Sequence, residues 1–321
     1  MRLYFLVLTI FIIFNAAQAK PIQILTSAID LNPENPTEKV VGQIRFLGGI
    51  ELRSDHEEFG GLSGMVVSRD GKHLTAVTDR GYRLTAKLAR DENGAIIAFL
   101  NADLSLIHNI DNQPLKDVKT SRDAEGLTAR ANGDLCVSFE RKHRIYCYRS
   151  GKDPLTSKAR KVKLPKDVKK TSPNGGLEAI TEMTDGRMLV LTEKYRDEQQ
   201  NFVGWIIGDR KTERITYQAV NVLRPVDLAT LSDGTVLILE RHFSPMAGVT
   251  NRLGRIDGGS IKAGALLTSR ELVRLRQPYS VDNYEALAVW QTNGRTIVHI
   301  LSDDNFNALQ RTLLLSFEII E

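Results

Sequence analysis

The sequence of 321 residues lacks the short motifs of several large enzyme classes. It contains no His-Glu-x-x-His and no paired Cys-x-x-Cys, so a common zinc site is not indicated. The nearest approach to Gly-x-Ser-x-Gly is Gly61-Leu62-Ser63-Gly64-Met65, which lacks the last glycine and leaves a serine-hydrolase elbow unsupported. No glycine-rich phosphate loop opens a helix, which argues against nucleotide chemistry.

Long helical and long apolar stretches are also missing, with one exception at the start of the chain. Leu3 to Phe14 is an apolar run after Arg2, and Ala17-Gln18-Ala19 fits the small-x-small cleavage pattern of a signal peptide. The alternative is an uncleaved membrane anchor, but a run of 12 residues is short for a bilayer. We therefore expect a signal peptide at 1–19 and a single domain at 20–321. The mature protein would be periplasmic or secreted, with no membrane span after cleavage.

Cysteine is scarce, with only Cys136 and Cys147 in the chain. A tight turn at 141–142 would place the two cysteines directly opposite each other on neighbouring strands. In an oxidising compartment this geometry favours a disulfide. The alternative is a pair of buried free thiols, which are common in strands.

One sequence motif, which we call the repeated phrase, occurs five times along the chain. It consists of a short apolar strand, an Asp-Gly or Asn-Gly turn, a second apolar strand and then an acidic residue. This is the strongest short-range signal for a β-hairpin. An acidic residue also opens the first strand in the second, third and fifth copies. The five turn glycines are Gly71, Gly133, Gly186, Gly234 and Gly294.

A hairpin that recurs at this period, with more strands between the copies, predicts a β-propeller of four-stranded antiparallel sheets. Packing small sheets face to face around an axis buries their apolar faces and leaves only short edges. The fifth repeat is one strand short, and Gln43 to Leu52 can supply the missing strand. We therefore predict five blades, closed by an N-terminal strand. Six blades are the alternative if Ile22 to Leu31 forms a degenerate extra one.

The repeated acids should converge, because the first strand of each blade lines the channel and the hairpin returns to the same end. Glu125, Glu178 and Glu285 open first strands, and a second set of acids closes the second strands: Asp79, Glu140, Glu193, Glu240 and Asp303. Clustered carboxylates repel one another unless a cation compensates. Ca²⁺ is one candidate, since it takes six to eight oxygen ligands.

Basic residues that directly follow the acids are the other candidate: Arg80, Arg141, Lys194 and Arg241. They can pair with acids of neighbouring blades, which would make the ring purely structural, or they can meet an anionic substrate. The stretch from Ser172 to Glu178 has the same two interpretations. Its Gly-Gly pair can bring backbone amides to a ligand, or it can form a tight turn between blades.

Lys158 to Lys170 carries seven basic residues and one acid. It lacks the aromatic side chains that nucleic-acid readers interleave with basic ones, so we interpret it as a solvated outer strand and loop. We expect no nucleic-acid partner, and we expect a monomer.

An ordered set of segments resembles the phytase-like family, also called "esterase-like activity of phytase". The segments run from about residue 59 to 305 and include Phe59–Gly64, Thr78–Gly81, Asp123–Leu127, Ser138–Arg141, Asn174–Glu178, Asp227–Ala229, Leu239–Arg241 and Asn283–Leu287. The resemblance implies an exported bacterial propeller that hydrolyses esters or phosphoesters. It does not assign catalytic residues.

Three hypotheses follow. The first is a metal-dependent hydrolase, with Ca²⁺ as the expected cofactor, that acts on a small anionic or ester substrate. In this hypothesis the catalytic residues would be Glu125, Glu178 and Glu285. The metal ligands would be Asp79, Glu140, Glu193, Glu240 and Asp303, and the substrate-binding residues would be Arg80, Arg141, Lys194 and Arg241. The second hypothesis is a binding or scaffold propeller without chemistry. The third is a lactonase-like metal propeller.

Overall fold

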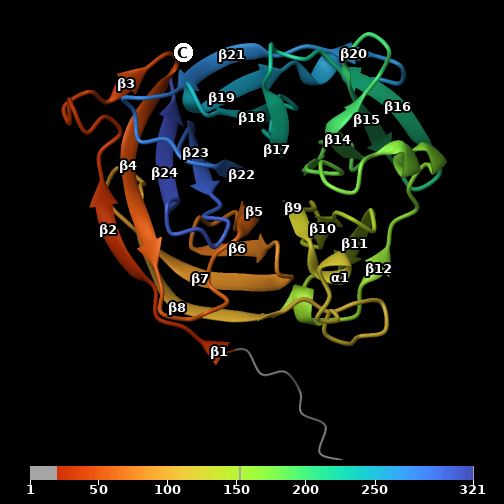
Figure 1. Ribbon diagram of the computed structural model, residues 1–321, viewed down its shortest axis with the longest axis horizontal. Helices are drawn as coiled ribbons and strands as arrows, with labels where there is room; N and C mark the ends of the chain where they lie inside the picture. The colour runs from red at the N-terminus through yellow and green to blue at the C-terminus, as the bar shows by residue number, and fades with distance from the viewer. Residues whose placement is uncertain (1–19, 152, 321) are drawn as a thin grey trace, which may run out of the picture.

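The structure is a computed structural model that describes residues 20–151 and 153–320. The chain forms five small, mainly antiparallel sheets that stand as blades around a central channel (Figure 1). This confirms the predicted all-β, five-bladed propeller. The predicted signal peptide, at 1–19, lies outside the described residues. No helix in the described part of the chain is long and apolar enough to span a membrane.

Blades 1 and 2 are formed by the first half of the chain, apart from β2 to β4. Blade 1 runs from the channel outwards as β5 (Leu62–Val67), β6 (His73–Thr78), β7 (Tyr82–Arg90) and β8 (Ile96–Leu106), with β1 (Lys20–Pro21) on its outer edge. Blade 2 consists of β9 (Ala124–Ala129), β10 (Leu135–Phe139), β11 (Arg144–Tyr148) and β12 (Arg160–Lys161). The short helix α1 (Lys119–Arg122) precedes it, and the 3₁₀ turns η1 (Pro154–Thr156) and η2 (Lys166–Lys170) flank its last strand.

Blades 3 and 4 follow in chain order. Blade 3 consists of β13 (Ala179–Glu182), β14 (Met188–Arg196), β15 (Phe202–Ile207) and β16 (Thr212–Tyr217), with β20 (Leu266–Leu267) on its edge. Blade 4 consists of β17 (Arg224–Thr230), β18 (Val236–Ser244), β19 (Gly248–Ile256) and β21 (Arg270–Leu275), and the 3₁₀ turn η3 (Gly258–Ser260) lies between its last two strands.

Blade 5 joins the two ends of the chain. Its inner strands are β22 (Tyr284–Thr292), β23 (Arg295–Ser302) and β24 (Thr312–Ile319), and β4 (Ile44–Arg53) pairs with β24 as the predicted closing strand. β2 (Leu25–Ile29) then pairs with the outer side of β4, and β3 (Val40–Val41) also pairs with β4. The segment from Ile22 to Leu31 therefore extends blade 5 and does not form a sixth blade.

The five hairpin turns need a backbone that only glycine adopts without strain. The φ angles of the turn glycines all lie in the left-handed region, between 72° at Gly71 and 88° at Gly234. The apolar faces of the hairpins pack against the next blade, and five hydrophobic clusters each fill one interface between neighbouring blades. The interfaces hold the inner strands at fixed places around the channel.

Cys136 and Cys147 are directly opposite each other in the register of β10 and β11, with their Cα atoms 4.1 Å apart, and they form a disulfide. Both side chains are buried in the cluster between blades 2 and 3. The bond links the second and third strands of blade 2.

Candidate functional site

One end of the channel is shaped by a β-bulge that recurs near the start of the inner strand. In blades 1, 2, 4 and 5 the register shifts there, so that the inner strand has one more residue than its partner. The positions at this irregularity are Ser63, Glu125, Val226 and Glu285, and Glu178 directly precedes β13 at the corresponding place in blade 3. A bulge turns a side chain away from the regular alternation of a strand, which aims Glu125 and Glu285 into the channel.

A second set of acids reaches the same end from the second strands. The backbone N–H of each donates a hydrogen bond to the carbonyl of a residue just before the inner strand, which holds the two strand ends together. The pairs are Asp79 to Gly61 at 2.9 Å, Glu140 to Asp123 at 2.9 Å, Glu193 to Gly176 at 3.1 Å and Asp303 to Asn283 at 3.0 Å.

Together the two sets surround a polar cavity of about 230 Å³, which we call the acidic cavity. Its acidic lining residues are Asp79, Asp123, Glu125, Glu140, Glu178, Glu193, Glu285 and Asp303, and its basic ones are Lys119, Arg141, Lys194 and Arg241. Carboxylates thus outnumber cations two to one in a small space. All three sequence-predicted catalytic acids and four of the five predicted metal-binding acids lie here.

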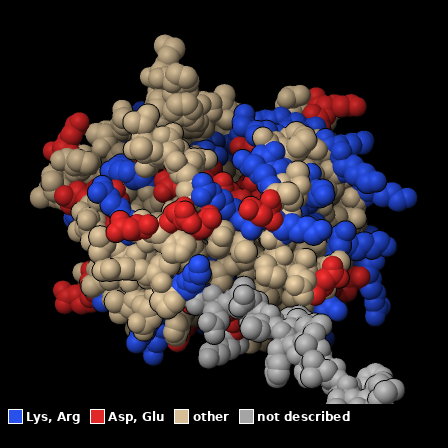
Figure 2. Space-filling model, turned by 60° about the horizontal axis from the view of Figure 1, so that its bottom comes forward, with Lys and Arg blue, Asp and Glu red and all other residues tan. Residues whose placement is uncertain are grey.

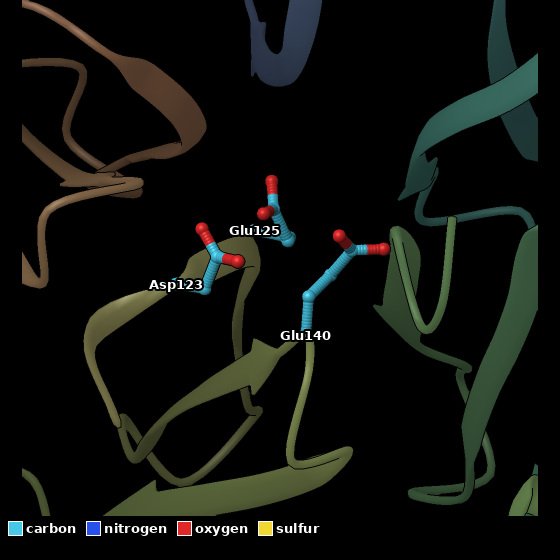
Figure 3. Close-up of side chains that lie close together, drawn as sticks. All are labelled: Asp123, Glu125 and Glu140. Carbon is cyan, nitrogen blue, oxygen red and sulfur yellow. The ribbon is translucent and has the colours of Figure 1, made fainter. Parts of the chain in front are cut away.

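Three of these carboxylates form the tightest group. One oxygen from each of Asp123, Glu125 and Glu140 lies within 4.8 Å of the others. Figure 3 shows Asp123 and Glu125 rising from the start of the inner strand of blade 2, and Glu140 reaching the same space from the end of β10. Three carboxylates at this separation match the ligand chemistry of a hard cation such as Ca²⁺.

Burial and mutual repulsion favour the protonated form of several of these carboxyl groups. Burial, followed by the charge of Asp123, raises the pKa of Asp79 to about 6. Burial, followed by the charges of neighbouring acids, raises the pKa values of Glu125 and Asp303 well above their usual range. The same two causes raise the pKa of Glu178, with Glu125 as the largest charge contribution. Each carboxylate would gain from a bound cation.

The resident basic side chains compensate only part of this charge. Arg141 pairs with Asp123, Arg241 pairs with Glu285 at 2.9 Å, and Glu193 pairs with Lys194 at 3.0 Å and with Arg224 at 3.3 Å. In the described part of the chain no ion pair reaches five of the acids, which are Asp79, Glu125, Glu140, Glu178 and Asp303. We call these five the unpaired acids.

The glycine pair of the Ser172–Glu178 loop serves the contact between blades. The backbone N–H groups of Gly175 and Gly176 both donate to Glu140 Oε1, from blade 3 to blade 2. A Cβ atom on Gly176 would lie 2.3 Å from the ring of His143, so no larger residue fits there without a shift. The amides of this loop are therefore engaged by Glu140, which fixes that carboxylate at the cavity wall.

A comparison with known families now identifies the chain. The model of the family described as "Phytase-like: Esterase-like activity of phytase" matches residues 57–306. The chain belongs to this family. The matched range contains every residue that lines the acidic cavity of this phytase-like propeller.

Solved structures similar to the phytase-like propeller share little of its sequence. A protein of unknown function from Dyadobacter fermentans aligns with a TM-score of 0.45 and 12% identity over 93% of this chain and 91% of its own. A catalytically inactive virginiamycin B lyase from Staphylococcus aureus aligns with a TM-score of 0.43 and 10% identity, over 92% and 99% of the two chains. The Cps50 (Swd1) β-propeller domain of Myceliophthora thermophila aligns with a TM-score of 0.42 and 10% identity, over 92% of this chain and 100% of its own. No curated protein matches the phytase-like propeller by sequence.

Glu240 does not join the acidic cavity, contrary to the sequence-based expectation. β18 continues past it, and the pairing of β18 with β19 is regular from Val236 to Ser244. Glu240 therefore keeps the strand alternation and faces blade 3, where it is fully buried, pairs with Arg252 and accepts a hydrogen bond from the Tyr217 hydroxyl at 3.0 Å. At the cavity, blade 4 of the phytase-like propeller instead contributes Val226 and Arg241.

Arg80 also lies outside the acidic cavity. Its guanidinium stacks on the ring of Phe306, 3.3 Å from the centroid, and pairs with Glu58 at 3.3 Å. It lines an adjacent pocket of about 410 Å³ that shares Asp79, Lys119 and Asn305 with the cavity. The other three predicted substrate-binding residues, Arg141, Lys194 and Arg241, do line the cavity.

Asp123 and Lys119 are site residues that the repeated phrase did not predict. Asp123 precedes the inner strand of blade 2, where other blades have Gly61, Gly176 and Asn283, so no recurrence marks it. The one local signal was its place two residues before Glu125. Lys119 lies on α1, outside the repeat, and no pattern indicated that it reaches the cavity.

Proposed function

We propose that the phytase-like propeller is a calcium-dependent hydrolase of phosphoesters or other esters, and that it acts at the acidic cavity. The observation that carries this proposal is the set of unpaired acids, of which Glu125 and Glu140 form a close group with Asp123. An ion-pair network that only joined blades would leave no such excess of buried carboxylates, because each uncompensated charge costs free energy on burial.

The residues present fit Ca²⁺. All the donors in the group are carboxylate oxygens, and Ca²⁺ binds carboxylates in a variable, flexible geometry. Asp79 Oδ1 is buried and accepts no hydrogen bond from the residues that the structure describes, so it is an oxygen without a partner among them at the cavity edge. Asp123, Glu125 and Glu140 would hold the ion, with Glu178 and Asp79 beside them. A bound Ca²⁺ would act as a Lewis acid and would neutralise negative charge that develops on the substrate.

The chain's own residues would divide the remaining work by their place around the cavity. The side of blades 3, 4 and 5 carries Lys194 and Arg241, which can hold an anionic group of the substrate. Glu193 and Glu285 pair with these cations and orient them. Val226 gives this side an apolar wall. Burial and the charge of Glu125 raise the pKa of Glu178, which favours the protonated carboxyl group that a general acid needs to donate to a leaving group.

Melting curves with calcium and with chelator test the metal. Calcium should raise the melting temperature of the wild type, because a ligand that binds only the folded state stabilises it. Glu178→Gln should reduce this shift, whereas Glu198→Gln, an exposed acid of the same blade, should retain it. A wild type whose melting is indifferent to calcium and to other divalent ions would contradict the metal site and favour a binding or scaffold propeller.

A substrate screen tests the chemistry. Phosphomonoesters, carboxylic esters and lactones are compared with and without chelator, after the metal content of the purified protein has been measured. The proposal expects turnover of an ester or phosphoester that chelator abolishes and calcium restores. Turnover of lactones alone would replace the proposed substrate class by the lactonase alternative.

A further inference from the structure

The outer edge of blade 2 carries a surface unlike the acidic cavity. Seven basic residues between positions 158 and 170 are all exposed, and we call them the basic edge: Lys158, Arg160, Lys161, Lys163, Lys166, Lys169 and Lys170. They belong to β12, to η2 and to the segments that flank β12. Figure 2 shows Lys and Arg side chains projecting from the flank on which Figure 1 places β12.

Neighbouring acids leave most of this charge uncompensated. Arg160 pairs with Asp134 at 2.6 Å, and the single acid of the segment, Asp167, lies 3.8 Å from Arg214. The lysines that form ion pairs in the described part of the chain are Lys39, Lys194 and Lys211, none of which belongs to the basic edge. Within residues 20–151 and 153–320, the six lysines of the basic edge thus have no ion-pair partner, and their side chains are exposed on one flank.

The charge is concentrated here and not spread over the molecule. Seven basic residues and one acid lie between 158 and 170, while the formal net charge of the whole chain is only +4, so the remainder is slightly acidic. Lysines on an edge strand also prevent pairing with another chain, which accounts for Lys161 on β12. That function does not account for Lys166, Lys169 and Lys170, because η2 has no free strand edge to protect.

We propose that the basic edge docks the propeller on an anionic lipid surface. All but one of its cations are lysines, which act as compact point charges, whereas bidentate recognition of a phosphate uses the arginine fork. The segment has no aromatic residue on which a base could stack, so its composition does not fit a single-stranded nucleic acid. A layer of anionic headgroups requires only several cations near one another, and each adds to the binding.

The test is cosedimentation of the full chain with phosphatidylglycerol vesicles and with phosphatidylcholine vesicles. The variant replaces Lys166, Lys169 and Lys170 with Gln. The control replaces Lys72, Lys87 and Lys262, which are exposed elsewhere, so it removes the same total charge. All six positions are exposed, so both variants should melt like the wild type.

The wild type should bind the anionic vesicles but not the neutral ones. Its binding to the anionic vesicles should weaken as salt is added. The η2 variant should lose affinity on the order of 100-fold, and the control only about threefold, because proximity to the surface decides each contribution. Equal losses in both variants would overturn the proposal, since only net charge would then matter. Tighter binding to a DNA duplex than to the vesicles, at equal phosphate concentration, would also overturn it in favour of a soluble polyanion.

Discussion

In blade 2 the second strand ends at Phe139 and Glu140 turns into the channel, whereas in blade 4 the second strand runs on through Glu240 to Ser244. Both acids occupy the same place in the repeated phrase. Glu140 accepts two backbone N–H groups at the cavity wall, and Glu240 pairs with Arg252 inside the blade interface. Whether the strand pairing is interrupted thus decides which acids belong to a binding site and which belong to the core.

The largest expected effect comes from breaking the blade 4 pair. Arg252→Met leaves Glu240 as a buried charge without a cation, and losing one partner of a buried pair costs about 3–5 kcal/mol of unfolding free energy. Urea unfolding, monitored by tryptophan fluorescence, measures this loss of unfolding free energy. The loss should be the same with calcium and with chelator. The double variant that adds Glu240→Gln should recover part of it, and a double variant no better than the single one would contradict this account.

In blade 2 a disulfide joins the second and third strands, as the Glu240–Arg252 ion pair does in blade 4. Replacing Cys136 and Cys147 with Ala should lower the unfolding free energy by about 2–3 kcal/mol, since the bond closes only a short loop. Thiol titration of the unreduced, denatured wild type is the matching control. Two free thiols per chain would show that the bond does not form in the purified protein.

The pH dependence of the metal-free protein tests Asp79 at the edge of the acidic cavity. The pKa of Asp79 is raised from 3.8 to about 6 in the folded state. Between these values the folded protein holds a proton that the unfolded chain releases, so stability should rise as pH falls from about 7 to about 5. Over this pH range Asp79 should add about 2 kcal/mol at most to the free energy of unfolding. Asp79→Asn should flatten this part of the urea-midpoint profile, and an unchanged profile would refute the assignment.

The smallest expected effect is that of Glu240 on calcium. Glu125→Gln should weaken calcium binding at least about tenfold, because affinity follows ligand charge. Glu240→Gln should change the calcium midpoint less than about twofold, since its carboxylate does not reach the cavity, even though the variant unfolds more easily. Calorimetric titration below the melting temperature separates the two. A tenfold effect of Glu240→Gln would mean that blade 4 communicates with the site.

The sequence predicted the propeller and its closing strand because the hairpin turns repeat at a steady period and blade 5 is one strand short. The sequence also predicted that most of the cavity acids converge, since both ends of a hairpin lie at one end of the channel. The fate of Glu240 was not predictable in this way. Its surroundings in the sequence match those of Glu140, and the continuous register that buries it depends on how β19 pairs with β18.

Asp123 escaped prediction for a different reason. It is acidic in one blade only, and its position matters because Glu140 bonds to its carbonyl and Arg141 to its carboxylate. The basic edge shows the opposite case: seven cations were visible in the sequence, but their exposure and their lack of partners required the structure.

The closure of blade 5 by β4 sets the order in which the molecule can be completed. β4 pairs with β24, and Ile44 lies opposite Ile319, so the earliest long strand must wait for the last one. During synthesis the ring cannot close until the C-terminal residues have emerged, and contacts this distant in sequence form slowly. A chain cut short before Thr312 would leave β4 and β23 without a partner between them, so even a small C-terminal deletion should leave blade 5 open.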